Sequence, residues 1–179
     1  MKNKGVLYLT QAAAIAAVYV VLCQIFQPIS FKDVQVRIAE GLTILPYFTS
    51  AAIPGLFIGC LLGNLLGGAI PLDVVFGSCA TLLGALGTYA IGKWIRKKHA
   101  DGRKIKCLLA VPPIVVNALV IPFILYYGYG ITIPIPIQIA TVGAGEILSC
   151  GVIGMIFLFA LEKVGSRVFN PQGSRGSTD

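Results

Sequence analysis

Four long apolar runs dominate the sequence, at about 7–28, 73–94, 107–127 and 137–161. A helix needs about 20 mainly apolar residues to cross the hydrocarbon core of a bilayer. Only 12% of the residues are charged, whereas ordinary soluble domains carry about 25%. Strands of a membrane barrel would alternate in hydrophobicity over about ten residues, and these runs do not. The chain is therefore predicted to be an all-α membrane protein.

Two shorter apolar segments, 38–50 and 53–70, lie between the first and second long runs. Pro46 and Pro54 bracket "LPYFTSAAIPG", which predicts a tight reversal between the two segments. We therefore predict six transmembrane helices in one compact bundle. The bundle occupies residues 1–165, and a flexible cytoplasmic tail follows at 166–179.

The basic residues predict the orientation of the bundle. With six spans, both termini, the turn at 51–53 and the loop at 93–106 share one side of the membrane. That side carries twelve of the fourteen Lys and Arg residues: Lys2, Lys4, Lys93, Arg96, Lys97, Lys98, Arg103, Lys104, Lys106, Lys163, Arg167 and Arg175. The positive-inside rule then places both termini in the cytoplasm of a plasma-membrane protein. The net charge of +7 thus indicates topology and not nucleic-acid binding.

Signals for cleavage, catalysis and metal binding are weak. The first apolar run follows Lys2 and Lys4 but is long and lacks a clean A-x-A cleavage site, which indicates a retained helix. His99 is the only histidine, and the five cysteines include no C-x-x-C pair. "GTYAIGKW" places Trp94 where a P-loop requires Ser or Thr. These features argue against a metal site, a cofactor and an enzyme.

Polar side chains occur in the predicted outer half of the bundle. Arg37 and Glu40 are three residues apart on one helical face, at the outer end of the second segment. Asp73 begins the fourth helix, while Asn64 and Asn117 lie within the third and fifth. Each has a structural alternative: an interfacial ion pair for the first two, a helix cap for Asp73, and interhelical hydrogen bonds for the asparagines.

The sixth helix carries a polar stripe. It consists of Gln138, Thr141, Gly145, Glu146 and Ser149. Glu146 lies about 12 Å deeper than Gln138 at 1.5 Å per residue. A carboxylate near mid-membrane costs about 2.5–3.5 kcal/mol and is expected to face the bundle interior. Together these polar residues predict a cavity that opens toward the outside.

The first helix presents small residues four apart. In "QAAAIAAVYVVL", Ala12 lies over Ala16 and Ala13 lies over Ala17. Such faces let another helix approach closely. Internal packing is one reading, and docking of a partner protein is the other.

These features together resemble the substrate-binding S-components of energy-coupling factor (ECF) transporters. The stretches "VQVRIAEGLTILPYFTSAAIPGLFIGCLLGNLLGG", "LDVVFGSCATLL", "PPIVVNAL" and "GAGEILSCGVIG" resemble the QueT-type queuosine-precursor transporters, and the likeness covers residues 10–162. The resemblance implies a subunit that captures a 7-deazaguanine outside the cell. It also implies a transmembrane coupling subunit, which small residues of the first helix contact, and two ATP-hydrolysing subunits.

The chemistry of a 7-deazaguanine suggests roles for the polar residues. A carboxylate accepts the two adjacent N–H donors of the base edge, and an amide serves the carbonyl beside them. We expect Glu146 to take the first role, and Asn117, Asn64 or Gln138 the second. Glu40 or Asp73 would pair with a 7-aminomethyl cation, and Tyr126, Tyr127 or Phe48 would stack on the base. Arg37 would hold Glu40 or close the mouth through the loop at 30–36.

Two other functions stay open at this stage. The chain could be an S-component for another vitamin or nucleobase, or a stand-alone secondary transporter or channel. Within the queuosine precursors, queuine and its 7-aminomethyl and 7-cyano precursors all remain candidates.

Overall fold

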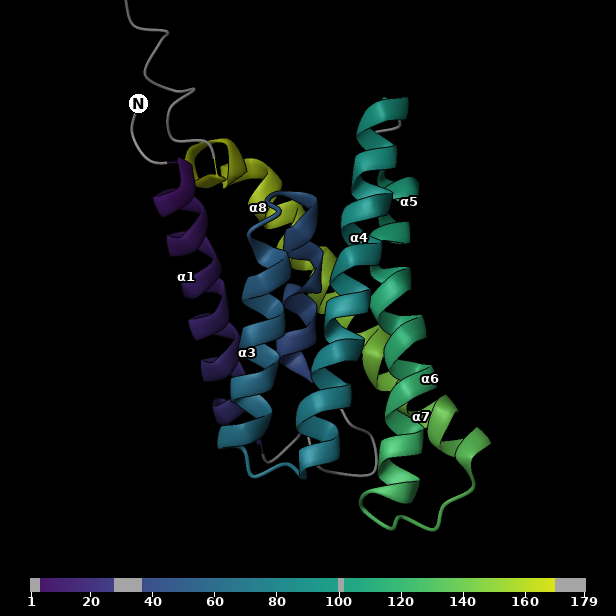
Figure 1. The fold of residues 1–179 in the computed structure, drawn as a ribbon. Helices are drawn as coiled ribbons and strands as arrows, with labels where there is room; N and C mark the ends of the chain where they lie inside the picture. Colours follow the sequence, from purple (N-terminus) through teal and green to yellow (C-terminus); the bar gives the residue numbers. More distant parts are fainter. Residues whose placement is uncertain (1–3, 28–36, 100–101, 170–179) are drawn as a thin grey trace, which may run out of the picture.

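The computed structural model describes residues 4–27, 37–99 and 102–169, and this part of the chain is helical without any strand. The predicted all-α class is confirmed. The elements, in chain order, are α1 (Lys4–Ile25), the 3₁₀-helix η1 (Ile38–Tyr47), α3 (Ala52–Leu66), the π-helical turn η2 (Asp73–Gly77), α4 (Ser78–Lys98), α5 (Arg103–Lys106), the 3₁₀ turn η3 (Cys107–Ala110), α6 (Val111–Tyr127), α7 (Ile135–Glu146), the π-helical segment η4 (Ile147–Ile153) and α8 (Gly154–Phe169). Figure 1 shows the long helices side by side in one bundle.

Four helical segments of the described chain are long and apolar enough to cross a membrane. They are Lys4–Ile25, Asp73–Lys98, Arg103–Gly128 and Ile135–Lys163, of 22, 26, 26 and 29 residues. They match the four long apolar runs of the sequence. The two shorter predicted spans correspond to η1 and α3, which have 10 and 15 residues. The structure thus supports a multi-pass membrane protein with four helices of full spanning length.

The central element is η1, which differs from the α-helix expected there. All residues from Ala39 to Pro46 are buried, and η1 contacts α1, α3, α4, η4 and α8. A 3₁₀-helix rises about 2.0 Å per residue, so η1 extends about 20 Å through the bundle. Glycine at position 41 permits its close approach to η4, since a Cβ there would lie 3.1 Å from the Ser149 carbonyl oxygen. The reversal predicted after Pro46 is present as the short turn at 48–51.

The interface between α1 and α3 depends on glycines. A Cβ at Gly59 would lie 2.8 Å from the Cβ of Tyr19, and one at Gly63 would lie 3.0 Å from the Cys23 sulfur. These approaches are too close for any larger residue without movement of a helix. Within the stretch "GCLLGNLLG", both glycines thus form a close-packing face toward α1. At Gly67, in contrast, a Cβ would meet the carbonyl oxygen of Gly63 on the same helix.

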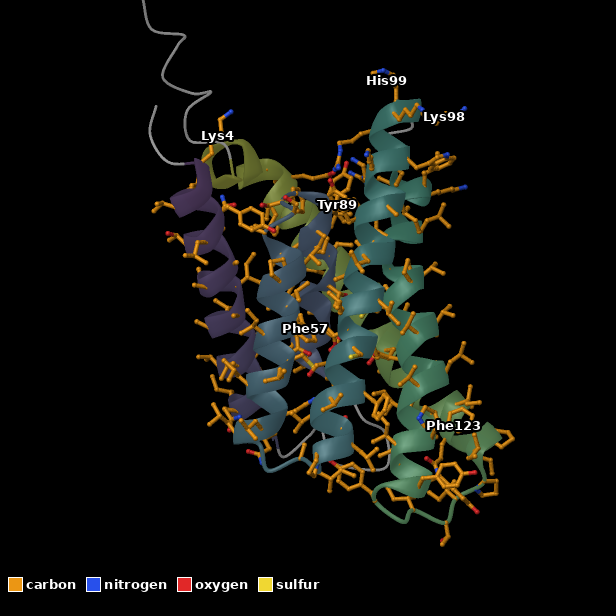
Figure 2. All side chains as sticks on the ribbon, in the orientation of Figure 1. Lys4, Phe57, Tyr89, Lys98, His99 and Phe123 are labelled. Atoms are coloured by element: carbon orange, nitrogen blue, oxygen red, sulfur yellow. The ribbon has the colours of Figure 1, made fainter. Side chains whose placement is uncertain are left out.

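Basic residues gather at one end of the bundle. Figure 2 shows Lys4, Lys98 and His99 together at this end. Here the Arg96 Nη1 donates to the Tyr47 carbonyl oxygen over 2.5 Å. Lys106 pairs with Glu162 over 2.6 Å, which joins α5 to α8. The structure therefore has a basic end and an opposite end where α1, α3 and α6 terminate (Figure 1).

Candidate functional site

A cavity of about 120 Å³ lies at the end of the bundle opposite the basic one. Its walls come from α1, η1, α3, η2, α6 and the loop that follows α6. Its polar lining residues are Gln27, Arg37, Asn64, Asp73 and Tyr129. Three of these, Arg37, Asn64 and Asp73, are predicted site residues, so elements distant in sequence bring them to one cavity.

A hydrogen-bonded chain fixes the polar wall of this cavity. The Arg37 guanidinium donates to Asn64 Oδ1, and the Asn64 amide donates to the Asp73 carbonyl oxygen over 3.2 Å. The Tyr129 hydroxyl donates to Asp73 Oδ2 over 3.1 Å. Burial and the neighbouring Asp73 carboxylate raise the pKa of Tyr129, so its phenol stays protonated as a donor. The other carboxylate oxygen, Asp73 Oδ1, has no hydrogen-bond partner in the structure.

Glu40 lies in the interior of the bundle and is 0% exposed. The hydroxyls of Tyr19 and Thr81 both donate to its Oε1, the second over 2.8 Å. Its Oε2 has no hydrogen-bond partner within the described part of the chain. We expected Arg37 to hold Glu40, but the described guanidinium contact goes to Asn64. The loop at 30–36, through which Arg37 was expected to close the mouth, lies outside the described residues.

A second buried carboxyl group accompanies Glu40. Glu146 is 1% exposed, and the Cys150 thiol donates to its Oε2 over 3.3 Å. Ligand atoms of Glu40, Glu146 and Cys150 lie within 4.8 Å of one another, a donor set that can in principle hold a cation. The buried Asn117 amide lies beside the Glu146 carboxyl group, close enough to hydrogen-bond to it. Glu146 and Asn117 do not line the cavity; they lie in the buried interior.

Two of the acidic residues are next to π-helical turns. Asp73 begins η2, and η4 follows directly after Glu146. A π-helical turn widens a helix and often occurs at a functional site. The sequence predicted regular helices at both places. As expected, the polar stripe of the last helix faces the interior, because Gln138, Gly145 and Ser149 are buried with Glu146.

Three further predicted site residues, Gln138, Phe48 and Tyr126, lie outside the cavity lining. The Gln138 amide donates to the carbonyl oxygens of Ile131 and Ile133, over 3.2 and 2.6 Å, and so holds the loop beside the cavity. Phe48 packs edge-to-face on Tyr47, with ring centroids 5.1 Å apart. Tyr126 is 40% exposed. None of these three side chains lines the cavity.

Two tyrosines near the acidic groups were not among the predicted site residues. Tyr129 lines the cavity in place of Tyr126 and Tyr127, because α6 ends at Tyr127 and the chain turns at Gly130, whose φ is +68°. Tyr19 supplies a buried hydroxyl to Glu40. Its only signal in the sequence is a tyrosine in the middle of an apolar helix.

The alanines of α1 fall on two different faces. Ala12 and Ala16 are buried against α3, where a Cβ at Gly55 would lie 2.7 Å from the Ala12 carbonyl oxygen. Ala13 and Ala17 are exposed. Internal packing therefore accounts for the first pair, and the second pair is available to lipid or to a partner.

No curated protein and no solved structure matches the chain significantly. The model of the QueT transporter family, in contrast, matches residues 9–163. That match covers all helical segments up to α8 and every polar residue of the cavity. The chain belongs to the QueT transporter family.

Proposed function

We propose that this chain is the substrate-capture subunit of an ECF-type importer, and that its substrate is a 7-deazaguanine such as a queuosine precursor. The observation that carries the proposal is a polar cavity, lined by Arg37, Asn64 and Asp73, in a member of the QueT transporter family. A bicyclic base is flat and rich in hydrogen-bonding groups. The cavity and the buried Glu146 beneath it offer carboxylate, amide and guanidinium groups to match these.

Binding of such a base requires the cavity to widen. Small-molecule sites have volumes of about 300–1,000 Å³, and this cavity has about 120 Å³. The structure therefore represents a closed arrangement in this proposal. The loop around Ile131 forms one wall and is held by the Gln138 amide and by the Ile131 N–H bond to the Leu125 carbonyl oxygen. Outward movement of this loop would admit the ligand toward Glu146 and Asn117.

We propose six membrane-crossing segments with both termini in the cytoplasm. The basic end with Lys4 and Lys98 would then face the cytoplasm, and the cavity would open to the outside. The short α3, of 15 residues, would cross together with the buried η1, because α3 packs against α1 and α4 and exposes its apolar outer face to lipid. On this topology the exposed Ala13 lies in the cytoplasmic half of α1 and Ala17 lies near its middle, and a coupling subunit with its two ATPase subunits would dock on this face.

The first test is direct ligand binding. Mass spectrometry of the purified chain should detect a retained 7-deazaguanine, and calorimetry with Glu146→Ala should show no binding while the helical circular-dichroism spectrum is unchanged. Glu162→Ala, at the basic end, is the control and should bind normally. An unchanged affinity of Glu146→Ala would remove Glu146 from the site.

A stand-alone secondary transporter is the second candidate function. Uptake by the chain alone in proteoliposomes, without ATPase subunits, would favour it. The ECF proposal predicts that uptake appears only when the coupling and ATPase subunits are present.

A further inference from the structure

We propose that the ligand site selects a positively charged ligand, so that a 7-deazaguanine with a protonated amine binds in preference to a neutral one. This inference rests on the proposed function and names the substrate class more narrowly. It comes from the balance of charge around the cavity.

Buried acidic groups outnumber basic groups in this half of the described chain. Asp73, Glu40 and Glu146 are each at least nine-tenths buried. The guanidinium of Arg37 is the one basic group that the structure describes there, and it is engaged with Asn64. The other described basic side chains belong to the first residue of α1, the end of α4, α5 and α8, at the basic end. The site therefore contains up to two more negative than positive charges.

Unused hydrogen-bonding capacity accompanies this charge. Asp73 Oδ1 and Glu40 Oε2 have no hydrogen-bond partner among the described residues. A buried polar atom without a partner costs about 1–3 kcal/mol, and more when it is charged. Asp73 lines the cavity directly, and its free oxygen is buried beside Gly77, so a donor reaches this oxygen once the cavity has widened as proposed above.

An ammonium group would both balance the excess of acidic groups and donate hydrogen bonds to the unpaired carboxylate oxygens. It has three N–H donors and one positive charge, and a charge-assisted hydrogen bond to a carboxylate is stronger than a neutral one. In a medium of low dielectric constant the charge also acts on Glu40 and Glu146, which share the interior beneath Asp73. A nitrile in the same position has no donor and no charge, so it leaves Asp73 Oδ1 without a partner.

The test compares 7-aminomethyl-7-deazaguanine with 7-cyano-7-deazaguanine, two ligands of similar size with different charge. Calorimetry on the purified full chain, in chelator-treated buffer, should give at least tenfold higher affinity for the amine. Asp73→Asn keeps an oxygen acceptor for Tyr129. It should reduce the preference for the amine to less than threefold, mainly by lowering the affinity for the amine ligand. Glu40→Gln, which keeps an acceptor for Tyr19 and Thr81, should also reduce the preference for the amine. Glu162→Gln, which neutralises a carboxylate at the basic end, should keep the full preference.

Three outcomes would overturn the inference. Equal affinity of the wild-type chain for the two ligands would do so and would leave the 7-deazaguanine proposal in place. A preference for the amine that persists in both Asp73→Asn and Glu40→Gln would assign the selectivity to other groups. Failure of the folded chain to bind either ligand would overturn both proposals. Thermal unfolding of each variant in detergent separates loss of binding from loss of fold.

Discussion

Thr81 on α4 donates a hydrogen bond to Glu40 on η1 over 2.8 Å, in the middle of the bundle. Both side chains are buried, and the Tyr19 hydroxyl donates to the same carboxylate oxygen from α1. Glu40 thus connects η1 to two of the long helices. Glu40 is the one charged residue of η1, and its carboxylate adds a polar connection to the apolar packing that holds η1 between its neighbours.

Thr81→Val is expected to destabilise the protein. The substitution keeps the shape of the side chain but removes one donor to a buried carboxylate oxygen, at a cost of about 1–3 kcal/mol. Thermal unfolding of the detergent-solubilised chain measures the effect. Thr10→Val is the matched control, since Thr10 is exposed and its hydroxyl bonds only to Val6 O, four residues earlier in α1. Equal stability of the two variants would mean that Glu40 does not depend on Thr81.

Gly59→Ala is expected to disturb the interface between α1 and α3. The new Cβ would lie 2.8 Å from the Cβ of Tyr19 and 3.1 Å from the Cα of Ala16. Both neighbours are fixed to the α1 backbone, so the helices must separate, at a cost of about 1–3 kcal/mol for an overpacked core. Gly143→Ala serves as the control, because its nearest neighbour, Ala118 Cβ, would be at an ordinary 3.7 Å. A melting temperature of Gly59→Ala equal to that of the control would refute the close packing.

Ala13→Leu and Ala16→Leu are expected to have different effects. Ala13 is exposed and Ala16 is buried against α3. Ala13→Leu should leave ligand binding and stability unchanged but block uptake by vesicles that also contain the coupling and ATPase subunits. Ala16→Leu should lower the unfolding temperature of the isolated chain, since the larger side chain enters the helix interface. Normal uptake by Ala13→Leu would remove this face from the proposed docking surface.

Gly77→Ala should weaken ligand binding more than it weakens the fold. A Cβ at this position would lie 2.5 Å from Asp73 Oδ1 and 3.3 Å from Asn64 Nδ2. Both are ends of polar side chains at the cavity wall, so the methyl group displaces them without forcing helices apart. We expect at least a tenfold loss of affinity for a 7-deazaguanine, measured by calorimetry. A normal affinity would show that the positions of Asp73 and Asn64 are not critical for binding.

The sequence predicted the helices and the burial of the polar residues better than it predicted their contacts. Hydropathy located the four helical segments of spanning length and the shorter η1 and α3, because long apolar runs in a membrane protein have few alternatives to a helix. It did not predict that η1 is 3₁₀, or that Gly41 packs closely against η4, because contacts between distant segments are not visible in local hydropathy. Helical spacing suggested a pairing of Arg37 with Glu40. The actual partners, Asn64 for Arg37 and Tyr19 for Glu40, come from other helices, which spacing within one segment cannot reveal.

The proposed orientation predicts opposite accessibility of two exposed positions. His99 ends α4 at the basic end, and Thr132 lies in the loop before α7, near the cavity. The exposed native cysteines, Cys79 and Cys107, are first replaced by serine, and the singly substituted His99→Cys and Thr132→Cys variants are made on this background. A membrane-impermeant maleimide should label Thr132→Cys in intact cells, but His99→Cys only after the membrane is permeabilised. The positive-inside rule supports this result because the basic residues around His99 favour the cytoplasm. Labelling of His99→Cys in intact cells would reverse the orientation and place the cavity on the cytoplasmic side.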